Sequence, residues 1–356
     1  MTAKKRGRLL GEPSSEGLVY VSDTEPGIRR RRAGKGFCYM LPDGTRICDD
    51  VDLNRVRALA IPPAWKDVWI CIDPNGHLQA TGRDAKGRKQ YLYHGGFREA
   101  RDSAKFEHLL AFGRRLPRIR EAVLHDLALP GLPREKVLAT VVHLLQATLI
   151  RIGNADYAKQ NKSYGLTTMR RAHVSVENSV LRFDFKGKSG RVWHLRMMDR
   201  RVARIVRSCQ ELPGQALFKY LDSAGDTHEV SSTDVNAYLA SLAGRSPGGP
   251  ITAKDFRTWA ATVMMVDSLR RSPQPRSAAH GNREVVAALK EIAKRLGNTV
   301  AVCRRSYVHP AIIELYMAGR LKARYGHSLD ESLSPEERAT LTLLRRWKAE
   351  QQEPFH

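Results

Sequence analysis

The chain has 356 residues, of which 42% are hydrophobic, so it is long and apolar enough for about two domains with packed cores. Its 60 Lys and Arg residues outnumber 37 Asp and Glu residues, and the formal charge of +23 with a pI of about 10.1 favours a polyanionic partner, above all nucleic acid. The five cysteines include no CxxC pair, which argues against a disulfide framework or a zinc site. No run of about 18 apolar residues is present, which argues against a membrane helix. We therefore expect a soluble cytoplasmic protein.

The N-terminal part of the chain has the composition of an arm followed by a small β domain. Residues 1–16 are basic, polar and without apolar periodicity, which predicts a flexible basic arm. Residues 17–95 contain the short apolar runs LVYVSD, GFCYML and VWICID, separated by the turn signals PDG and PNG, and we predict a β-rich antiparallel domain here. One short helix is expected in DLNRVRALAIPPAW, ending before Pro62 and Pro63.

Helical periodicity dominates the rest of the chain. We predict a mainly α-helical catalytic domain over residues 96–325 and a C-terminal helical tail over residues 326–356. The first helical stretch is expected to break at Pro117, because proline cannot donate a backbone hydrogen bond. A helix that begins at Pro133 carries one apolar face and brings Arg151 to its C-terminal end, where the helix dipole favours a cation.

Strand periodicity returns within the helical region. HVSVEN, VLRFDF and RVWHLR alternate as strands, and KGKSG predicts a hairpin turn with Lys188 at its tip. Thr252 and Asp255 predict a cap for the helix that carries Arg257. Further helices are expected in DRRVARIVRSCQEL, SSTDVNAYLASLAG, TAKDFRTWAATVMMVDSLRR, NREVVAALKEIAKRLG, PAIIELYMAGRL and SPEERATLTLLRRWKAE. The predicted fold class is α+β, with a small N-terminal antiparallel domain and a larger helical domain that contains a short β-hairpin sheet.

Four residues lie in contexts that suit attack on a phosphodiester. Arg151, Lys188, Arg257 and Tyr307 occur in LIRIG, DFKGKSGRVWH, KDFRTWA and LGNTVAVCRRSYVH. A phenol with a pKa near ~10 is a weak nucleophile at neutral pH, and gathered cations help both the phenol and the phosphate. Taken singly, each residue also fits an ordinary core or surface position. In type and order the four contexts resemble the type IB DNA topoisomerases, in the small form of poxviruses and some bacteria, over roughly residues 15–320.

The resemblance implies a role for each of these side chains. Tyr307 would attack DNA and keep the 3′-phosphate as an ester, which releases a 5′-hydroxyl strand. Arg151 and Arg257 would hold the nonbridging oxygens of the phosphate, for which a guanidinium fork is suited. Lys188 would protonate the leaving 5′-oxygen, and it is preferred to Lys186 because the family places the active lysine second in FKGK.

Two helper residues follow from the same resemblance. Lys254 lies one helical turn before Arg257 and is expected to supply a proton or a phosphate contact. Asn298 stands nine residues before Tyr307, where many family members have histidine. Asparagine donates a neutral hydrogen bond but cannot be cationic, so we expect the role to persist in weaker form. His309 lies on the other side of Tyr307 and is interpreted as structural.

DNA contacts outside the catalytic residues are expected in the N-terminal domain. IPPAW at 61–65 and GRDAKGRKQYLYH at 82–94 resemble the DNA-contacting stretch of the family, with cations for phosphates and polar or aromatic side chains for base edges. The expected DNA-binding residues are Arg83, Lys86, Arg88, Lys89, Gln90, Tyr91 and Tyr93. The alternative is a charged hairpin on an ordinary sheet. Residues 29–32 and the basic arm are expected to add nonspecific affinity.

The resemblance implies a monomer that clamps duplex DNA, nicks one strand, allows rotation and reseals the strand. The phosphotyrosyl ester conserves the bond energy, so neither ATP, a metal ion nor another cofactor is required, and no GxxxxGK[ST] loop is present. Binding to DNA should weaken steeply as salt rises. We expect a bacterial, nucleoid-associated enzyme, a source that Asn298 also favours.

Three other functions stay open from the sequence. A tyrosine recombinase or integrase shares the chemistry, but it generally has HxxR where this chain has KDFR, and its N-terminal domain is helical. A noncatalytic DNA-binding protein would account for the charge and predicts that Tyr307→Phe leaves function intact. A metal-dependent nuclease would need paired carboxylates near the cationic residues, and the sequence shows none.

Overall fold

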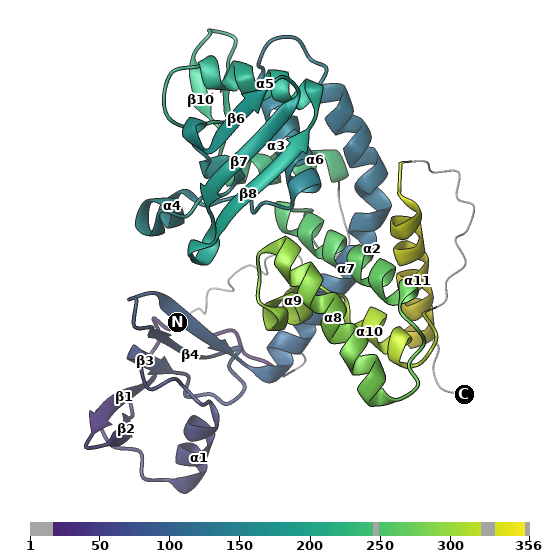
Figure 1. Ribbon diagram of the computed structural model, residues 1–356. Coiled ribbons are helices and arrows are strands. Elements are labelled where there is room, and N and C mark those ends of the chain that lie inside the picture. The colour runs from purple at the N-terminus through teal and green to yellow at the C-terminus, as the bar shows by residue number, and fades with distance from the viewer. Residues whose placement is uncertain (1–16, 245–248, 322–331, 353–356) are drawn as a thin grey trace. The chain divides into compact units, whose positions relative to one another are not determined.

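A computed structural model describes residues 17–244, 249–321 and 332–352 (Figure 1). The chain divides into two compact units, the first through Lys105 and the second from Phe106. This boundary lies within the long helix α2 (Gly95–Asp126). Among the described residues, no helix has both the length and the apolar character needed to cross a membrane.

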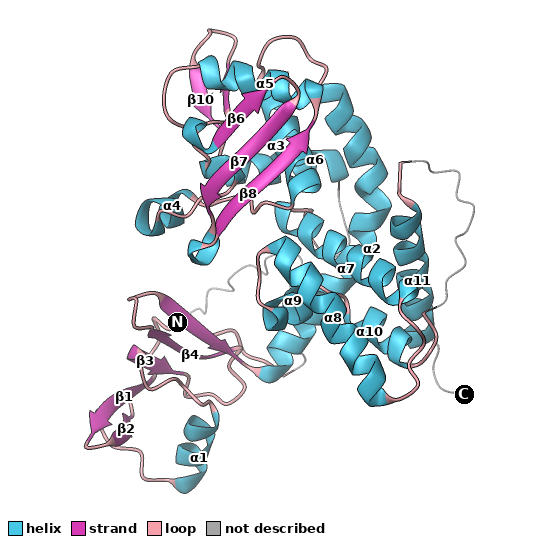
Figure 2. Ribbon diagram, viewed as in Figure 1, coloured by secondary structure: helices cyan, strands magenta, loops and turns pink. Residues whose placement is uncertain are grey.

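The first unit is built on a five-stranded antiparallel sheet, shown in magenta in Figure 2. In the order β2-β1-β3-β4-β5, its strands are β1 (Ile28–Ala33), β2 (Gly36–Met40), β3 (Lys66–Ile70), β4 (Leu78–Arg83) and β5 (Lys89–Tyr93). Apolar residues cover both faces, because Ile70 and Ala80 join one core cluster and Trp69 and Leu78 join another. The single helix α1 (Asp50–Ala58) is capped by Asp49, whose carboxylate accepts from the Asp52 N–H. The antiparallel N-terminal sheet is as predicted.

The strand prediction for LVYVSD was wrong. Only Val19 forms a single bridge there, to Gly76, while the arginine-rich segment IRRRRA forms β1. Arg30 explains why such a charged segment is a strand. Its guanidinium donates to the carbonyls of Ile61 (3.1 Å) and Trp65 (2.7 Å) and lies 4.2 Å from the centroid of the Phe37 ring. This arginine is therefore part of the fold, although its charge makes β1 look like a surface segment.

The second unit is mainly helical and contains a three-stranded sheet (Figure 1). Besides most of α2, its helices are α3 (Arg134–Thr148), α4 (Ala155–Asn161), α5 (Arg200–Glu211), α6 (Ser232–Ala243), α7 (Ala253–Arg271), α8 (Ala278–Leu296), α9 (Val300–Ser306), α10 (Pro310–Met317) and α11 (Pro335–Gln352). The sheet consists of β6 (Val174–Glu177), β7 (Val180–Lys186) and β8 (Val192–Met198), and a separate pair consists of β9 (Lys219–Leu221) and β10 (Thr227–Glu229). The hairpin sheet and the long helices agree with the predicted α+β class.

Helix α2 continues through Pro117, so the predicted break was wrong. Proline in a helix interior costs about 3 kcal/mol, because it removes one hydrogen bond and crowds the preceding turn. Phe112, Leu116 and Ile119 lie on either side of the proline and are all buried in the core of the second unit. Burial of large side chains is worth about 1.5–3 kcal/mol each, so packing outweighs the local cost.

Helix α3 is the central element of the second unit. The predicted apolar face, which includes Val137, Val141 and Leu145, is buried, but Leu138 and Val142 on other sides of the helix are buried as well. Most of α3 is therefore enclosed by its neighbours, and Glu135, Gln146 and Ala147 are its exposed positions. The C-terminal end of α3 is therefore a fixed point in the domain, and the candidate active site begins there.

Candidate active site

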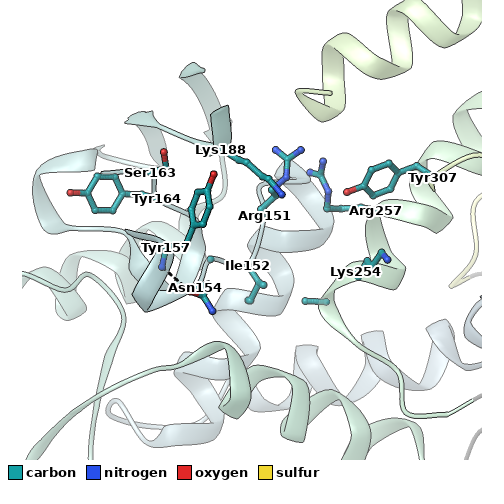
Figure 3. A pocket seen from close by; sticks show the side chains of 12 residues that line it. Arg151, Ile152, Asn154, Tyr157, Ser163, Tyr164, Lys188, Lys254, Arg257 and Tyr307 are labelled. Carbon is teal, nitrogen blue, oxygen red and sulfur yellow. Dashed lines mark hydrogen bonds between the residues drawn. The ribbon is translucent and has the colours of Figure 1, made fainter. Parts of the chain in front are cut away.

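A pocket of about 510 Å³ in the second unit gathers most of the predicted catalytic residues (Figure 3). It is lined by Arg151, Ile152, Gly153, Asn154, Tyr157, Ser163, Tyr164, Lys188, Ala253, Lys254, Arg257 and Tyr307. Five of the six predicted catalytic side chains thus line one cavity. The sixth, Asn298, contacts Arg151. No lining residue of this pocket is Asp or Glu.

Arg151 lies just after the end of α3 rather than within the helix. The helix ends at Thr148 because Leu149 adopts a left-handed conformation with φ 57°, which is uncommon for a bulky residue. The Nη2 of Arg151 donates to the carbonyl of Gly297 (3.3 Å) and to Oδ1 of Asn298. These bonds tie the segment after α3 to the segment after α8.

Arg257 is the most buried of the predicted catalytic residues, with 3% of its surface exposed. Its guanidinium donates to the carbonyls of Leu149 and Leu296 (2.7 Å), at the C-terminal ends of α3 and α8, where helix dipoles favour a cation. The guanidinium carbon lies 5.2 Å from the centroid of the Tyr307 ring. Burial and the nearby charge of Arg151 lower the pKa of Arg257. Its Nε has no hydrogen-bond partner within the described part of the chain.

The N-terminus of α7 holds Arg257 and Lys254 in place. Asp255 accepts from both the N–H (2.7 Å) and the hydroxyl (2.9 Å) of Thr252, so the predicted cap is confirmed. Asn236 of α6 accepts from the N–H of Ala253 (3.0 Å). Lys254 lies in the first turn of this capped helix and is exposed to the pocket.

Tyr307 lies at the junction between α9 and α10 and points into the pocket (Figure 3). Its carbonyl accepts from the hydroxyl of Thr262 on α7 (3.2 Å). Burial alone would raise the pKa of the Tyr307 phenol. The charge and hydrogen bond of Arg257, together with the charges of Arg151 and Lys254, outweigh burial, so that the pKa lies below its ordinary value. The phenolate, which is the nucleophilic form, therefore forms at lower pH than in an ordinary tyrosine.

Asn298 is the polar residue behind Arg151. It follows Gly297, the left-handed C-cap of α8 (φ 64°), and its own N–H donates to the carbonyl of Ala293 (2.9 Å). Its Oδ1 accepts from Arg151, which leaves Nδ2 as the donor. That Nδ2 is buried and has no hydrogen-bond partner among the residues that the structure describes. The amide thus keeps an N–H donor that no described residue uses.

Lys188 lies in the short 3-10 turn (Lys188–Gly190) between β7 and β8, at the predicted hairpin tip, and Figure 3 shows its side chain extending into the pocket. The structure reveals how this turn is held. Arg191 donates to the carbonyl of Lys294 near the end of α8 (2.8 Å), and Trp193 packs so closely that a Cβ at Gly297 would lie 2.3 Å from its ring. The exposed lysine is therefore carried on an anchored turn.

The far end of the pocket contains residues that the sequence analysis missed. Asn154 caps α4, and its side chain accepts from the N–H of Tyr157 (2.9 Å), drawn as a dashed line in Figure 3. Tyr157, Ser163 and Tyr164 add three hydroxyl groups to the lining. The only signal in the sequence was the asparagine before a short helix, which is weak by itself.

The predicted DNA-binding residues lie on the β4–β5 hairpin of the first unit, and most of their polar atoms already have internal partners. The carboxylate of Asp84 accepts hydrogen bonds from Nε of Arg88 (2.8 Å) and from Nε2 of Gln90 (3.0 Å). The hydrogen bond from Arg88, with backbone N–H groups, lowers the pKa of Asp84 to about 2. Lys89 pairs with Asp23 at 2.5 Å. Carboxylates are thus the partners of Arg88 and Lys89 in this structure.

The remaining members of the set differ in exposure. Arg83 donates to the carbonyl of Gly87 (3.0 Å), and Lys86 is exposed at the loop. Tyr91 is 47% exposed and stacks on Tyr93 at 6.1 Å, whereas Tyr93 packs partly buried against the Trp69 cluster. Tyr93 therefore supports the sheet, and Tyr91 presents its ring to solvent.

Comparisons with known proteins agree over most of the chain. Residues 94–325 match the model of the eukaryotic DNA topoisomerase I catalytic core, and residues 36–84 match that of the bacterial DNA topoisomerase IB N-terminal domain. DNA topoisomerase 1B of Acanthamoeba polyphaga mimivirus is 32% identical over 299 residues, or 82% of this chain and 87% of the relative. DNA topoisomerase I of monkeypox virus is 20% identical over 66% of this chain and 71% of its own length. The catalytic-core match contains every residue of the pocket, and the chain belongs to the type IB DNA topoisomerases, a family of isomerases that act on DNA.

Proposed function

We propose that the protein relaxes supercoiled duplex DNA by transient cleavage of one strand through a 3′-phosphotyrosyl intermediate, strand rotation and religation, with no need for ATP or an obligatory metal ion. One observation carries the proposal: the Tyr307 phenol shares a carboxylate-free pocket with cations that lower its pKa. Such a phenol is both a better nucleophile and a better leaving group, which a reversible cleavage requires.

Cleavage proceeds by exchange of one phosphate ester for another. The Tyr307 phenol releases its proton to water and the phenolate attacks phosphorus. The bond from phosphorus to the 5′-oxygen breaks, and Lys188 gives a proton to that oxygen. In religation the 5′-hydroxyl attacks the phosphotyrosine, Lys188 takes the proton back, and Tyr307 leaves. One ester bond breaks for each that forms, so the reaction needs no external energy source.

Three donors stabilise the charge that builds on the nonbridging oxygens. Arg151 and Arg257 supply guanidinium groups, and Asn298 supplies the amide N–H in place of a cationic histidine. The Arg257 Nε and the Asn298 Nδ2 are buried donors without a partner in the described structure. An unpaired buried donor costs about 1–3 kcal/mol, and a phosphate oxygen would remove that cost. Lys254 adds a phosphate contact and lowers the pKa of Tyr307.

DNA binding outside the pocket is assigned to the β4–β5 hairpin, through Arg83, Lys86, Arg88, Lys89, Gln90, Tyr91 and Tyr93. The protein acts as a monomer that clamps the duplex, and in a bacterial cell it works on the nucleoid. The formal charge of +23 supports binding to a polyanion, and the affinity should fall steeply as salt rises.

The decisive experiment is relaxation of supercoiled plasmid in EDTA without ATP, with the wild type and Tyr307→Phe side by side. The wild type is expected to relax the plasmid and to be trapped on DNA by denaturant. Tyr307→Phe keeps the ring and the cation contact but lacks the oxygen, so both relaxation and trapping should disappear. An inactive wild type or an active Tyr307→Phe contradicts the proposal.

A further inference from the structure

The C-terminal helix α11 is built into the second unit, although it lies beyond residues 94–325 of the catalytic-core match. Leu341, Leu343 and Leu344 of α11 are buried in the main core. The helix packs against α7, which carries Arg257, and against α10, which follows Tyr307 (Figure 1). A segment attached only as a tail would not fill the core of the catalytic unit.

The first anchoring point of α11 is Glu337, which is 8% exposed. Its carboxylate accepts two hydrogen bonds from the Arg120 guanidinium of α2 (both 2.8 Å) and one from the indole Nε1 of Trp259 (3.1 Å). Burial raises the pKa of Glu337, but the hydrogen bonds and charge of Arg120 outweigh burial and lower it overall, so the group is ionised. Trp259 lies on α7 two residues after Arg257. The ion pair therefore ties α11 to α2, and the hydrogen bond from Trp259 ties it to the helix that carries Arg257.

The second anchoring point is Trp347, whose ring meets that of His309 edge to face at 5.2 Å. His309 is buried and caps α10, and its backbone N–H donates to the Thr262 hydroxyl (3.2 Å). That hydroxyl also reaches the carbonyl of Tyr307 (3.2 Å). Trp347 thus supports the segment that carries Tyr307. It does so through His309, which lies two residues after the proposed catalytic side chain.

We propose that α11 is a brace that sets the alignment of Tyr307 on Arg257, with Glu337 and Trp347 as positioning residues. The two catalytic side chains come from different elements, and the 5.2 Å between the Arg257 guanidinium carbon and the Tyr307 ring depends on how those elements pack. The brace contacts both elements. The inference rests on the proposed function, because it takes Tyr307 as nucleophile and Arg257 as its partner.

The test measures single-turnover cleavage of a duplex that loses its cleaved strand, so that religation cannot occur. Glu337→Gln keeps the shape of the side chain and removes its charge. It is expected to slow cleavage at saturating DNA by about tenfold while the Kd for DNA changes less than about twofold, since small misplacements of reacting groups cost rate rather than binding. Trp347→Leu should act similarly. Arg346→Gln, an exposed site on the same helix, is the matched control and should cleave at the wild-type rate.

A double-mutant comparison separates positioning from general destabilisation. Arg257→Ala alone should slow cleavage on the order of 10²–10³-fold, and Glu337→Gln added to it should cost less than about twofold more, because the group that it positions is gone. Equal losses from Glu337→Gln in both backgrounds overturn the brace. A fast Arg257→Ala enzyme instead contradicts the proposed function itself.

Variants are compared at a temperature where circular dichroism shows them folded. Should Glu337→Gln fail to fold, Trp259→Phe decides, because it keeps an aromatic ring in the core and removes the indole N–H that donates to Glu337, together with part of the indole ring. Loss of cleavage in Trp259→Phe with unchanged DNA affinity supports the brace. Wild-type cleavage by Trp259→Phe, or an equal loss in Arg346→Gln, overturns it.

Discussion

The β4–β5 hairpin and the candidate active-site pocket are both rich in cations, but only the cations of the hairpin are paired with carboxylates. The hairpin pairs Arg83 with Asp67, Arg88 with Asp84 and Lys89 with Asp23. The pocket places Arg151, Lys188, Lys254 and Arg257 together without a carboxylate among its lining residues. Exposed ion pairs are worth at most about 1 kcal/mol and exchange readily, so the hairpin can trade its carboxylates for phosphates. The lining residues of the pocket include no such partner, so under the proposed function a phosphate would be the first anion to pair with these cations.

Among the tests of this comparison, the largest expected effect comes from Arg257→Lys, which keeps the charge of the pocket but removes the guanidinium fork. Lysine cannot donate to the carbonyls of Leu149 and Leu296 and also contact Tyr307. We expect single-turnover cleavage to slow on the order of 10²–10³-fold, as when an oxyanion donor is removed. Lys290→Arg, a conservative change at an exposed site on α8, serves as the control. Near-normal cleavage by Arg257→Lys would mean that charge alone, rather than orientation, defines the pocket.

Introducing a carboxylate beside Arg151 tests directly whether the pocket must lack one. Asn298→Asp gives Arg151 an internal anion and places negative charge beside the phosphate oxygens, so cleavage should slow by roughly 10²-fold. Asn298→His restores a donor that can be cationic and should cleave at least as fast as the wild type. Both rates are measured by covalent complex formation at saturating DNA. An Asn298→Asp enzyme as fast as the wild type would show that the Asn298 amide has no part in the reaction.

The pH dependence of cleavage tests how the cations act on Tyr307. Because its pKa is lowered, the phenolate forms at lower pH, so the rate should rise with pH and level off before the ordinary tyrosine range near ~10. Lys254→Gln removes one of the charges that lower this pKa, which moves the inflection to higher pH. The loss at neutral pH should be less than about tenfold, which corresponds to one pKa unit, and should shrink as pH rises. If the inflection of the pH–rate profile is the same in Lys254→Gln and the wild type, Lys254 contacts the phosphate without lowering the pKa of Tyr307.

The smallest effect is expected in the hairpin. Lys86→Ala should weaken DNA binding a few-fold and reduce the slope of log K against log salt by about one, as for the loss of one phosphate contact. Filter binding over a range of salt concentrations measures both quantities. Lys290→Ala on α8 is the matched removal of an exposed lysine. If the two variants have the same slope, the hairpin contributes only to the general positive charge.

Sequence motifs identified the chemical groups of the pocket but not the packing that holds them. Tyr307 and Arg257 stand out because their neighbours form specific patterns, whereas the acceptors of Arg257 are the backbone carbonyls of Leu149 and Leu296, which no side-chain pattern reveals. Short elements were missed for a related reason. The helices α4 and α9 and the strands β9 and β10 are too brief to show periodicity.

Two other predictions failed because tertiary contacts outweigh local sequence preferences. The break expected at Pro117 did not occur because the surrounding apolar residues are buried. The charged segment of β1 is a strand because Arg30 satisfies carbonyls within the same unit. In both places the structure depends on contacts with residues distant in sequence. A short stretch of sequence around Pro117 or Arg30 does not contain those residues.

The left-handed turn at Leu149 has a consequence for how this enzyme can change over time. The oxygen that receives the Arg257 guanidinium belongs to the main chain, so exchange of the side chain at 149 or 296 leaves the acceptor itself in place. The hydrogen bonds of Arg257 therefore do not depend on the side chains at these two positions, provided that the backbone keeps its path. Because Leu149 (φ 57°) and Leu296 are both buried, the replacements that keep this geometry are apolar residues that fit the core and, at position 149, accept a left-handed backbone.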